Sequence, residues 1–201
     1  MSAQGKEPMA ERKAKGALIV PLAMIIRDQK QIDWLKAGLT EQDLKKIQEG
    51  ILTSAWYDIG LMDRAGNAVY QIVGQRKPEL GFEFGQGILC KILLSVYKGV
   101  LAKNDPAEML ARFANLYNGT WFQSGRAEFI RTETGGVIWV SEPEGIPCQE
   151  GFLHMLKGVF FRIIQENGGD NIQIECAEEA VYETRKLTAL NYHLSWQNKK
   201  G

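Results

Sequence analysis

The period at which apolar residues recur changes at Asn118-Gly119, and this change limits the fold more than any other feature of the sequence. Before it, apolar residues recur every three or four positions, which is typical of helices with one buried face. After it they recur mainly every second position, which is typical of strands. One helical segment, Gln149–Glu166, interrupts the second pattern. The sequence therefore predicts an α+β fold, in which a helical half packs on a four-stranded antiparallel sheet with a crossing helix.

The second half is predicted to form a strand-strand-helix-strand-strand (ββαββ) unit. Its central helix carries a continuous apolar stripe of Phe152, Met155, Leu156, Val159, Phe160, Ile163 and Ile164. The predicted strands are 121–132, 137–141, 171–176 and 187–196. Thr134-Gly135-Gly136 indicates a hairpin between the first two, and Asn167-Gly168-Gly169 indicates the end of the helix.

The first half is predicted to be helical. Thr40 and Asp43 form a variant of the capping box, and Asp105 with Pro106 opens another helix. The predicted elements are a helix, or a short strand leading into one, at 17–34, a helix after Thr40, a helix capped by Ser54 and continuing to 73, a loop at 74–81, a helix at 85–103 and a helix ending at Tyr117. We expect residues 1–15 to be a disordered tail and 16–197 to be one domain, with a helical part at 16–118 and the ββαββ part at 119–197.

Charge and cysteine usage restrict the partners and the compartment. The chain has 24 basic and 24 acidic residues, whereas a general nucleic-acid binder usually carries a basic excess. A net charge of zero mildly favours self-association, so we expect a homodimer. Cys90, Cys148 and Cys176 are odd in number and far apart, which favours buried free thiols and a cytoplasmic protein. The apolar run 17–26 is too short to span a bilayer, and we expect no membrane span.

Several short segments, together with the order of elements, resemble a ligand-binding superfamily. The segments are Lys15-Gly16, 51–57, Tyr117, Trp121, 148–151 with Gly158, and 192–196. The superfamily includes the 4-vinyl reductase domains, the vesicle-tethering subunits of the transport-particle complex and the haem nitric-oxide-binding domains. The resemblance is stronger to a paralogous family of about this length from myxobacteria and related bacteria. It implies one α+β domain with space for a small ligand between helices and sheet.

Two departures from this pattern argue against haem. Haem-binding members use a proximal histidine in the earlier half, whereas the first histidine of this chain is His154. They also carry Tyr-x-Ser-x-Arg, and here Ser124 and Arg126 follow Phe122 rather than a tyrosine. The 4-vinyl reductase domains tend to carry a second cysteine after the position of Cys176, which this chain lacks. We therefore expect no cofactor.

No catalytic or metal site is expected either. The two histidines, His154 and His193, have no ligand at the short spacing that zinc sites use. Cys148 stands near a helix N-terminus, where the dipole could lower its pKa, but His154 points away from it and a structural thiol is the alternative. The glycine-rich segment 81–87 lacks a Walker lysine and carries Glu83, so we interpret it as a loop that permits close packing of helix and sheet.

The remaining candidate is an aromatic junction between the helical half and the sheet. Such a junction can be plain core or can hold a small apolar ligand. The candidate ligand-binding residues are Trp56, Tyr57, Tyr117, Trp121, Arg126, Cys148 and His154. The first function that we predict is a non-enzymatic regulatory or adaptor domain that acts through a protein partner. The alternative is a small-molecule or cofactor sensor, and the third possibility is an enzyme of the reductase type.

Overall fold

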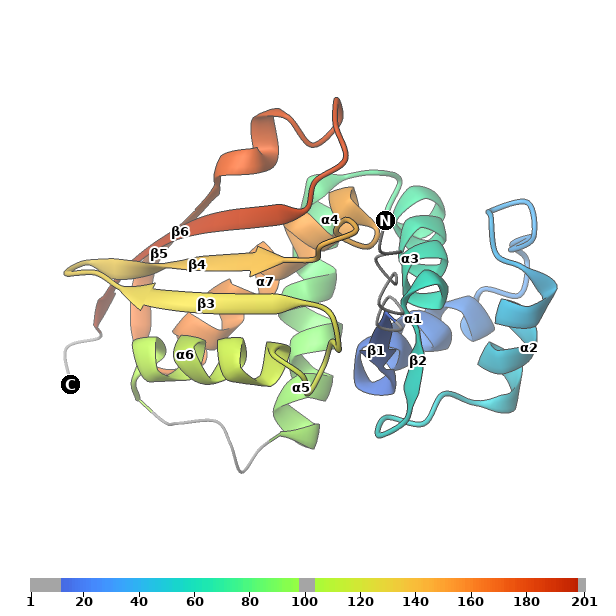
Figure 1. Cartoon of the computed structure of the whole chain (residues 1–201), viewed down its shortest axis with the longest axis horizontal. Helices are drawn as coiled ribbons and strands as arrows, with labels where there is room; N and C mark the ends of the chain where they lie inside the picture. The colour runs from blue at the N-terminus through green and yellow to red at the C-terminus, as the bar shows by residue number, and fades with distance from the viewer. Residues whose placement is uncertain (1–11, 98–103, 199–201) are drawn as a thin grey trace, which may run out of the picture.

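The computed structural model describes residues 12–97 and 104–198 and contains two lobes (Figure 1). The N-terminal lobe comprises β1 (Lys13–Lys15), α1 (Gly16–Asp28), α2 (Glu41–Glu49), β2 (Trp56–Asp58) and α3 (Ile59–Ala68), which continues into a π-helical turn, Val69–Val73. The C-terminal lobe comprises α4 (Pro78–Phe84), a second π-helical turn (Gly85–Leu89), α5 (Cys90–Val96), α6 (Pro106–Tyr117), β3 (Arg126–Arg131), β4 (Gly135–Ser141), α7 (Gln149–Glu166), β5 (Gly169–Cys176), a 3₁₀ turn (Ala177–Ala180) and β6 (Ala189–Asn198).

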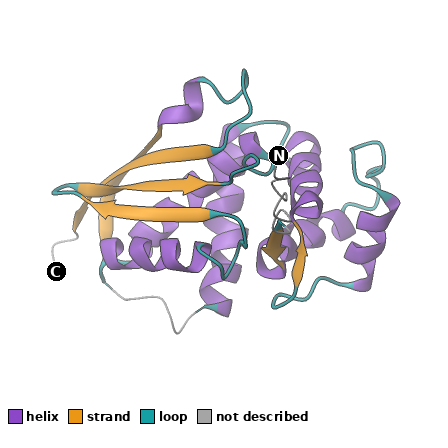
Figure 2. Cartoon of the chain, in the orientation of Figure 1, coloured by secondary structure: helices purple, strands orange, loops and turns teal. Residues whose placement is uncertain are grey.

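The four-stranded antiparallel sheet is confirmed, with the strand order β3-β4-β6-β5. Ile138 pairs with Tyr192 and Val140 with Leu190, and these four side chains are buried on the face that α6 and α7 cover (Figure 2). His193 and Trp139 point to the opposite face and are exposed. The helix predicted at Gln149–Glu166 has these bounds in the structure. The first strand begins at Arg126 rather than at residue 121, because 119–124 form a turn.

Two segments of the N-terminal lobe differ from the prediction. Trp56–Asp58 is a strand paired with β1, and the helix predicted from Ser54 begins only at Ile59. Asp58 is its N-cap, because its carboxylate accepts a hydrogen bond of 2.8 Å from the Gly60 amide. Lys13–Lys15, which we assigned to the polar tail, form β1, and residues 1–11 lie outside the described part of the chain.

The helix starts that rest on capping chemistry are confirmed. The Thr40 hydroxyl accepts from the Asp43 amide and the Asp43 carboxylate accepts from the Thr40 amide, which is a reciprocal capping box. Asp105 accepts from the amides of Ala107 and Glu108, with Pro106 at the first helical position.

Glycines allow α4 and α7 to cross in backbone contact. A side chain at Gly85 would overlap the Met155 carbonyl, and one at Gly158 would overlap the Phe82 carbonyl. The segment 81–87, expected as a loop against the sheet, is therefore helical and packs against α7. α4 begins at Pro78 within the expected loop 74–81, and the end of the helix predicted at 85–103 lies outside the described residues.

Strand β1 joins the two lobes. It pairs with β2, and it also forms backbone hydrogen bonds with the segment just before β3. The Lys15 amide donates to the Trp121 carbonyl at 2.8 Å, and the Gln123 amide donates to the Lys13 carbonyl at 3.0 Å. None of the helices within 12–97 and 104–198 has the length and apolarity needed to cross a bilayer.

Candidate functional site

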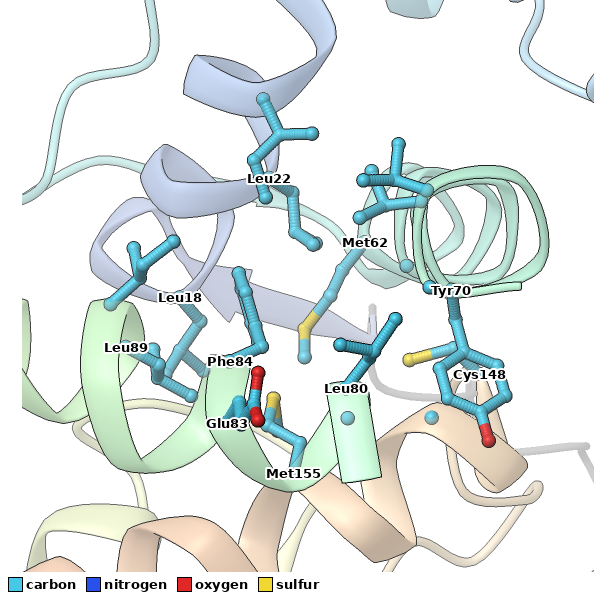
Figure 3. A pocket seen from close by; sticks show the side chains of 18 residues that line it. Leu18, Leu22, Met62, Tyr70, Leu80, Glu83, Phe84, Leu89, Cys148 and Met155 are labelled. Carbon is cyan, nitrogen blue, oxygen red and sulfur yellow. The ribbon is translucent and has the colours of Figure 1, made fainter. Parts of the chain in front are cut away.

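A cavity of about 350 Å³ lies where the N-terminal lobe meets α4 and the start of α7 (Figure 3). It is partly open to solvent. Its lining comes from α1, α3, both π-helical turns, α4 and α7: Leu18, Leu22, Ile25, Met62, Gly66, Val69, Tyr70, Val73, Gly74, Leu80, Gly81, Glu83, Phe84, Ile88, Leu89, Cys148, Gly151 and Met155. Ligand pockets of proteins are typically about 300–1,000 Å³, so this cavity can accommodate a small molecule.

Both π-helical turns border this cavity. Val69–Val73 contributes Val69, Tyr70 and Val73, and Gly85–Leu89 contributes Ile88 and Leu89. A π-helical turn inserts one extra residue into a helical turn, is rare, and is frequently found at functional sites. Their presence on two walls of one cavity marks it as the candidate site.

The chemistry of the lining is almost entirely apolar. Eight of the eighteen lining residues are leucine, valine or isoleucine, and Met62 and Met155 add flexible thioethers that adapt to ligands of different shape. Glu83 is the one charged residue among the lining residues that the structure describes. Such a surface binds by removal of apolar area from water.

Cys148 holds α7 against α3 at one side of the cavity. Its backbone lies in the left-handed region, with φ of 39° and ψ of 48°, and its amide donates a hydrogen bond to the Asp63 carboxylate. Its thiol touches Gly66, where a Cβ would stand 2.6 Å from Sγ. Burial raises the pKa of this thiol far above its usual value, and the nearby Asp63 carboxylate adds to the effect. Cys148 is thus a neutral wall residue and not a nucleophile.

Of the seven residues predicted to bind a ligand, Cys148 alone lines this cavity. His154 lies next to it on α7: it is 3 % exposed, and its ring centroid is 6.4 Å from that of Tyr70 and 5.8 Å from that of Tyr182. Burial lowers the pKa of His154, and the Glu179 carboxylate, 3.9 Å away, opposes this.

The other five predicted residues lie elsewhere. Trp56 and Tyr57 belong to β2, where the Tyr57 hydroxyl accepts from the Leu52 amide at 2.9 Å. Tyr117 and Trp121 are buried at the junction of α6 with the sheet. Arg126 is exposed at the start of β3 and donates to the Gly125 carbonyl.

The junction between the helices and the sheet is filled by aromatic rings. Phe113 packs edge-on against Trp121 and against Phe160, at 5.1 Å between centroids in both pairs, and Phe160 packs in the same way against Tyr192. Edge-to-face contact is a favoured arrangement of aromatic rings. A void beside Trp121 has a volume of only about 10 Å³, which is too little for more than one water.

A buried polar cluster lies between these rings and the lobe junction. Glu142 is fully buried; it accepts a hydrogen bond of 2.8 Å from the Ser124 hydroxyl and lies 3.5 Å from the Arg12 guanidinium. Burial raises the pKa of Glu142, while Ser124 and Arg12 act in the opposite direction. Ser124 is therefore engaged within the protein. Among the described residues no group of three or more histidine, cysteine or acidic side chains could hold a metal ion.

Sequence reasoning missed Tyr70, Met62, Met155 and Glu83, because they come from separate elements with no shared motif. A signal was present at Gly81 and Gly85, which indicated close packing at α4. It did not reveal that α4 would form a cavity wall together with α1 and α3.

Comparison with known proteins establishes the fold. No family model and no curated protein matches the sequence. Among solved structures, the Fe(II) unliganded H-NOX protein from K. algicida is 12 % identical with a TM-score of 0.62, over 93 % of this chain and 98 % of that one. A mutant of the T. Tengcongensis H-NOX is 13 % identical with a TM-score of 0.60, over 93 % and 100 %. A structure on heme distortion in the H-NOX family is 14 % identical with a TM-score of 0.60, over 93 % and 97 %.

Proposed function

We propose that this protein is a small-molecule sensor domain that binds an apolar ligand without haem. The observation that carries the proposal is the 350 Å³ apolar cavity between the two lobes. The H-NOX-like fold supports the proposal, since solved structures with this fold include studies of heme, a bound small molecule, in the H-NOX family. The sensor alternative predicted from the sequence therefore has more support than the adaptor.

The residues around the cavity do not fit haem. Haem iron is held in proteins by histidine, cysteine thiolate, methionine with histidine, or tyrosine. No histidine lines the cavity within the described residues, and burial raises the pKa of both Cys148 and Tyr70, which keeps them neutral. No lysine or arginine lines it to pair with the two carboxylates of haem. We expect that hemin added to the purified protein produces no saturable shift of its Soret band.

Occupancy of the cavity can change how the lobes pack. Val69 and Met62 belong to the N-terminal lobe, and Met155, on α7, belongs to the C-terminal lobe. A ligand in the cavity would therefore contact both lobes at once. Beside them, Cys148 joins α7 to α3, because its backbone amide donates a hydrogen bond to the Asp63 carboxylate. A ligand that binds one arrangement of the lobes more tightly shifts the population toward it, which is the physical basis of a sensor.

The experiment uses N-phenylnaphthylamine, a neutral apolar dye that fluoresces in apolar pockets. We expect saturable binding to the intact protein. Val73→Trp places a large ring in the cavity and should abolish most of the binding. Ile130→Trp is the matched control, because Ile130 is 57 % exposed on β3 and outside the lining. Equal binding by both variants would exclude the cavity as the site.

The sensor function also requires a structural response. Amide hydrogen exchange should slow on ligand binding at the start of α7 and in α3, which meet at Cys148 and Gly66. Protection limited to α4 would show binding without transmission between the lobes.

A second candidate is the regulatory adaptor, acting as a homodimer or with another protein. Ile130 and Trp139, on the adjacent strands β3 and β4, are 57 % and 37 % exposed. Exposed apolar residues of this size are found at protein interfaces. Sedimentation over a wide concentration range tests the homodimer, and a monomer throughout would exclude it.

A further inference from the structure

Glu83 is placed to select the charge of the ligand. It is the one charged residue among the lining residues described, and no lysine or arginine shares the lining with it. It is exposed, whereas its helical neighbours Phe82 and Phe84 are half-buried. Figure 3 shows Glu83 and Phe84 among the residues that line the cavity. The cavity therefore combines an apolar interior with a single acidic group at its exposed side.

No other described residue engages the Glu83 carboxylate. Within residues 12–97 and 104–198 it has no hydrogen bond and no ion pair. Two other acidic residues act on the lining residue Tyr70 but are outside the lining themselves. They are Glu150, which lies 3.4 Å from the Arg76 guanidinium, and Glu79. A ligand in the cavity would thus meet one carboxylate that has no partner among the described residues, and no lysine or arginine among the described lining residues.

We propose, on the basis of the proposed function, that the cavity selects cationic apolar molecules, namely amines with a hydrocarbon chain, over carboxylates of the same length. The hydrocarbon chain lies against Leu22, Leu80 and Met155, and the ammonium group faces Glu83. A carboxylate ligand would place two like charges together at an apolar wall, which is unfavourable. Specificity of this kind comes as much from repulsion of the wrong ligand as from attraction of the right one.

The test compares decylamine, decanol and decanoate, which share one chain and differ in charge. Each competes with N-phenylnaphthylamine for the full-length protein. We expect decylamine to bind more tightly than decanol, and decanoate more weakly. Glu83→Gln should lower the decylamine-to-decanoate affinity ratio by about threefold or more, as expected for a solvent-accessible charge, and leave decanol unchanged. Higher salt should lower the ratio in the wild-type protein as well.

Glu79→Gln is the matched control, since it removes the same charge from the same helix outside the lining. The ratio should stay at its wild-type value in this variant. A ratio that Glu83→Gln leaves unchanged, with decanol still bound, overturns the charge selection alone. Failure of decanol to displace the dye overturns the cavity as an apolar site, and the charge selection with it.

Discussion

The Cys148 thiol lies directly against Gly66, so that a Cβ at residue 66 would stand 2.6 Å from Sγ and 3.0 Å from the Cys148 Cβ. This contact joins α3 of the N-terminal lobe to Cys148, the N-cap residue of α7, beside the cavity. Cys148 is held there in a left-handed backbone conformation that residues other than glycine adopt rarely. At this point the two lobes therefore meet in a contact that one methyl group would disturb.

Gly66→Ala should destabilise the protein through this contact. Overpacking costs about 1–3 kcal/mol, and alanine returns about 1 kcal/mol of helix propensity, so we expect a net loss of about 1 kcal/mol in urea unfolding. In a Cys148→Gly background the same change should be neutral or stabilising, because the methyl enters the space that the thiol leaves. Gly87→Ala is the control, since no atom lies within 4 Å of its Cβ position. A loss of equal size in both backgrounds would contradict the contact.

The Asp43 carboxylate should make stability fall at acid pH. Burial alone would raise the pKa of Asp43, but two hydrogen bonds from Arg64, at 2.7 and 2.8 Å, and those from Thr40 outweigh it and lower the pKa from 3.8 to about 2. The folded pKa is below the unfolded one, so this stability is present above about pH 4 and is lost as the pH falls toward 2.

Asp43→Asn removes this titration. Its urea midpoint should depend less on pH across that window, by about 2 kcal/mol of unfolding free energy. Asp28→Asn, at an exposed position in the last turn of α1, serves as the comparison. A wild-type midpoint that does not change between pH 4 and pH 2 would show that the Asp43–Arg64 pair does not form.

Glu142 should produce the opposite dependence. Burial raises its pKa above 4.5, so the folded state holds this proton more tightly than the unfolded state. The contribution of protonated Glu142 to the unfolding free energy is present below pH 4.5 and is lost as the pH rises through the pKa of Glu142 in the folded state. The stability of Glu142→Gln relative to the wild type should therefore increase as the pH rises from 4.5.

Glu144→Gln is the matched variant for this measurement. Glu144 also lies 3.5 Å from Arg12, but its side chain is 44 % exposed. Its replacement should change stability little, because an exposed ion pair contributes little. A Glu142→Gln difference that stays constant as the pH rises from 4.5 would show that folding does not raise the pKa of Glu142.

The three cysteines should be unreactive in the folded protein. All are buried, and burial raises the pKa of Cys90 and of Cys176 to about 12 and that of Cys148 still further. The thiolate is the reactive form, so iodoacetamide at pH 8 should label none of them before unfolding and all three in guanidinium. Mass spectrometry of the labelled chain gives the count. Rapid labelling of Cys148 in the native protein would indicate that the lobes open beside the cavity.

The elements that the sequence predicts well are those that depend on local chemistry. The bounds of α7, the capping box at Thr40 and the start of α6 at Asp105 follow from periodicity and from side chains that bond to their own helix ends. The alternation of Leu190, Tyr192 and Leu194 likewise places β6 with one face in the core.

The elements that the sequence misses depend on distant partners. Trp56–Asp58 continues the helical pattern of the residues after it, yet pairing with β1 makes it a strand. The aromatic residues indicated a ligand space at the junction with the sheet, but they pack against one another there. The cavity could not be predicted, since its walls come from four separate stretches of the chain whose arrangement is set by tertiary packing.

The pairing of β1 has a consequence for how the chain folds as it is synthesised. Lys13–Lys15 leaves the ribosome long before Trp121 and Gln123, so the hydrogen bonds between them can form only after much of the chain has followed. Contacts between residues far apart in sequence form slowly, because a long loop must close first. The N-terminal lobe therefore completes its folding only after residues 121–123 have been synthesised. If synthesis stalls before residue 121, apolar residues of this lobe, Leu18 and Leu22 included, would stay exposed and could be bound by chaperones.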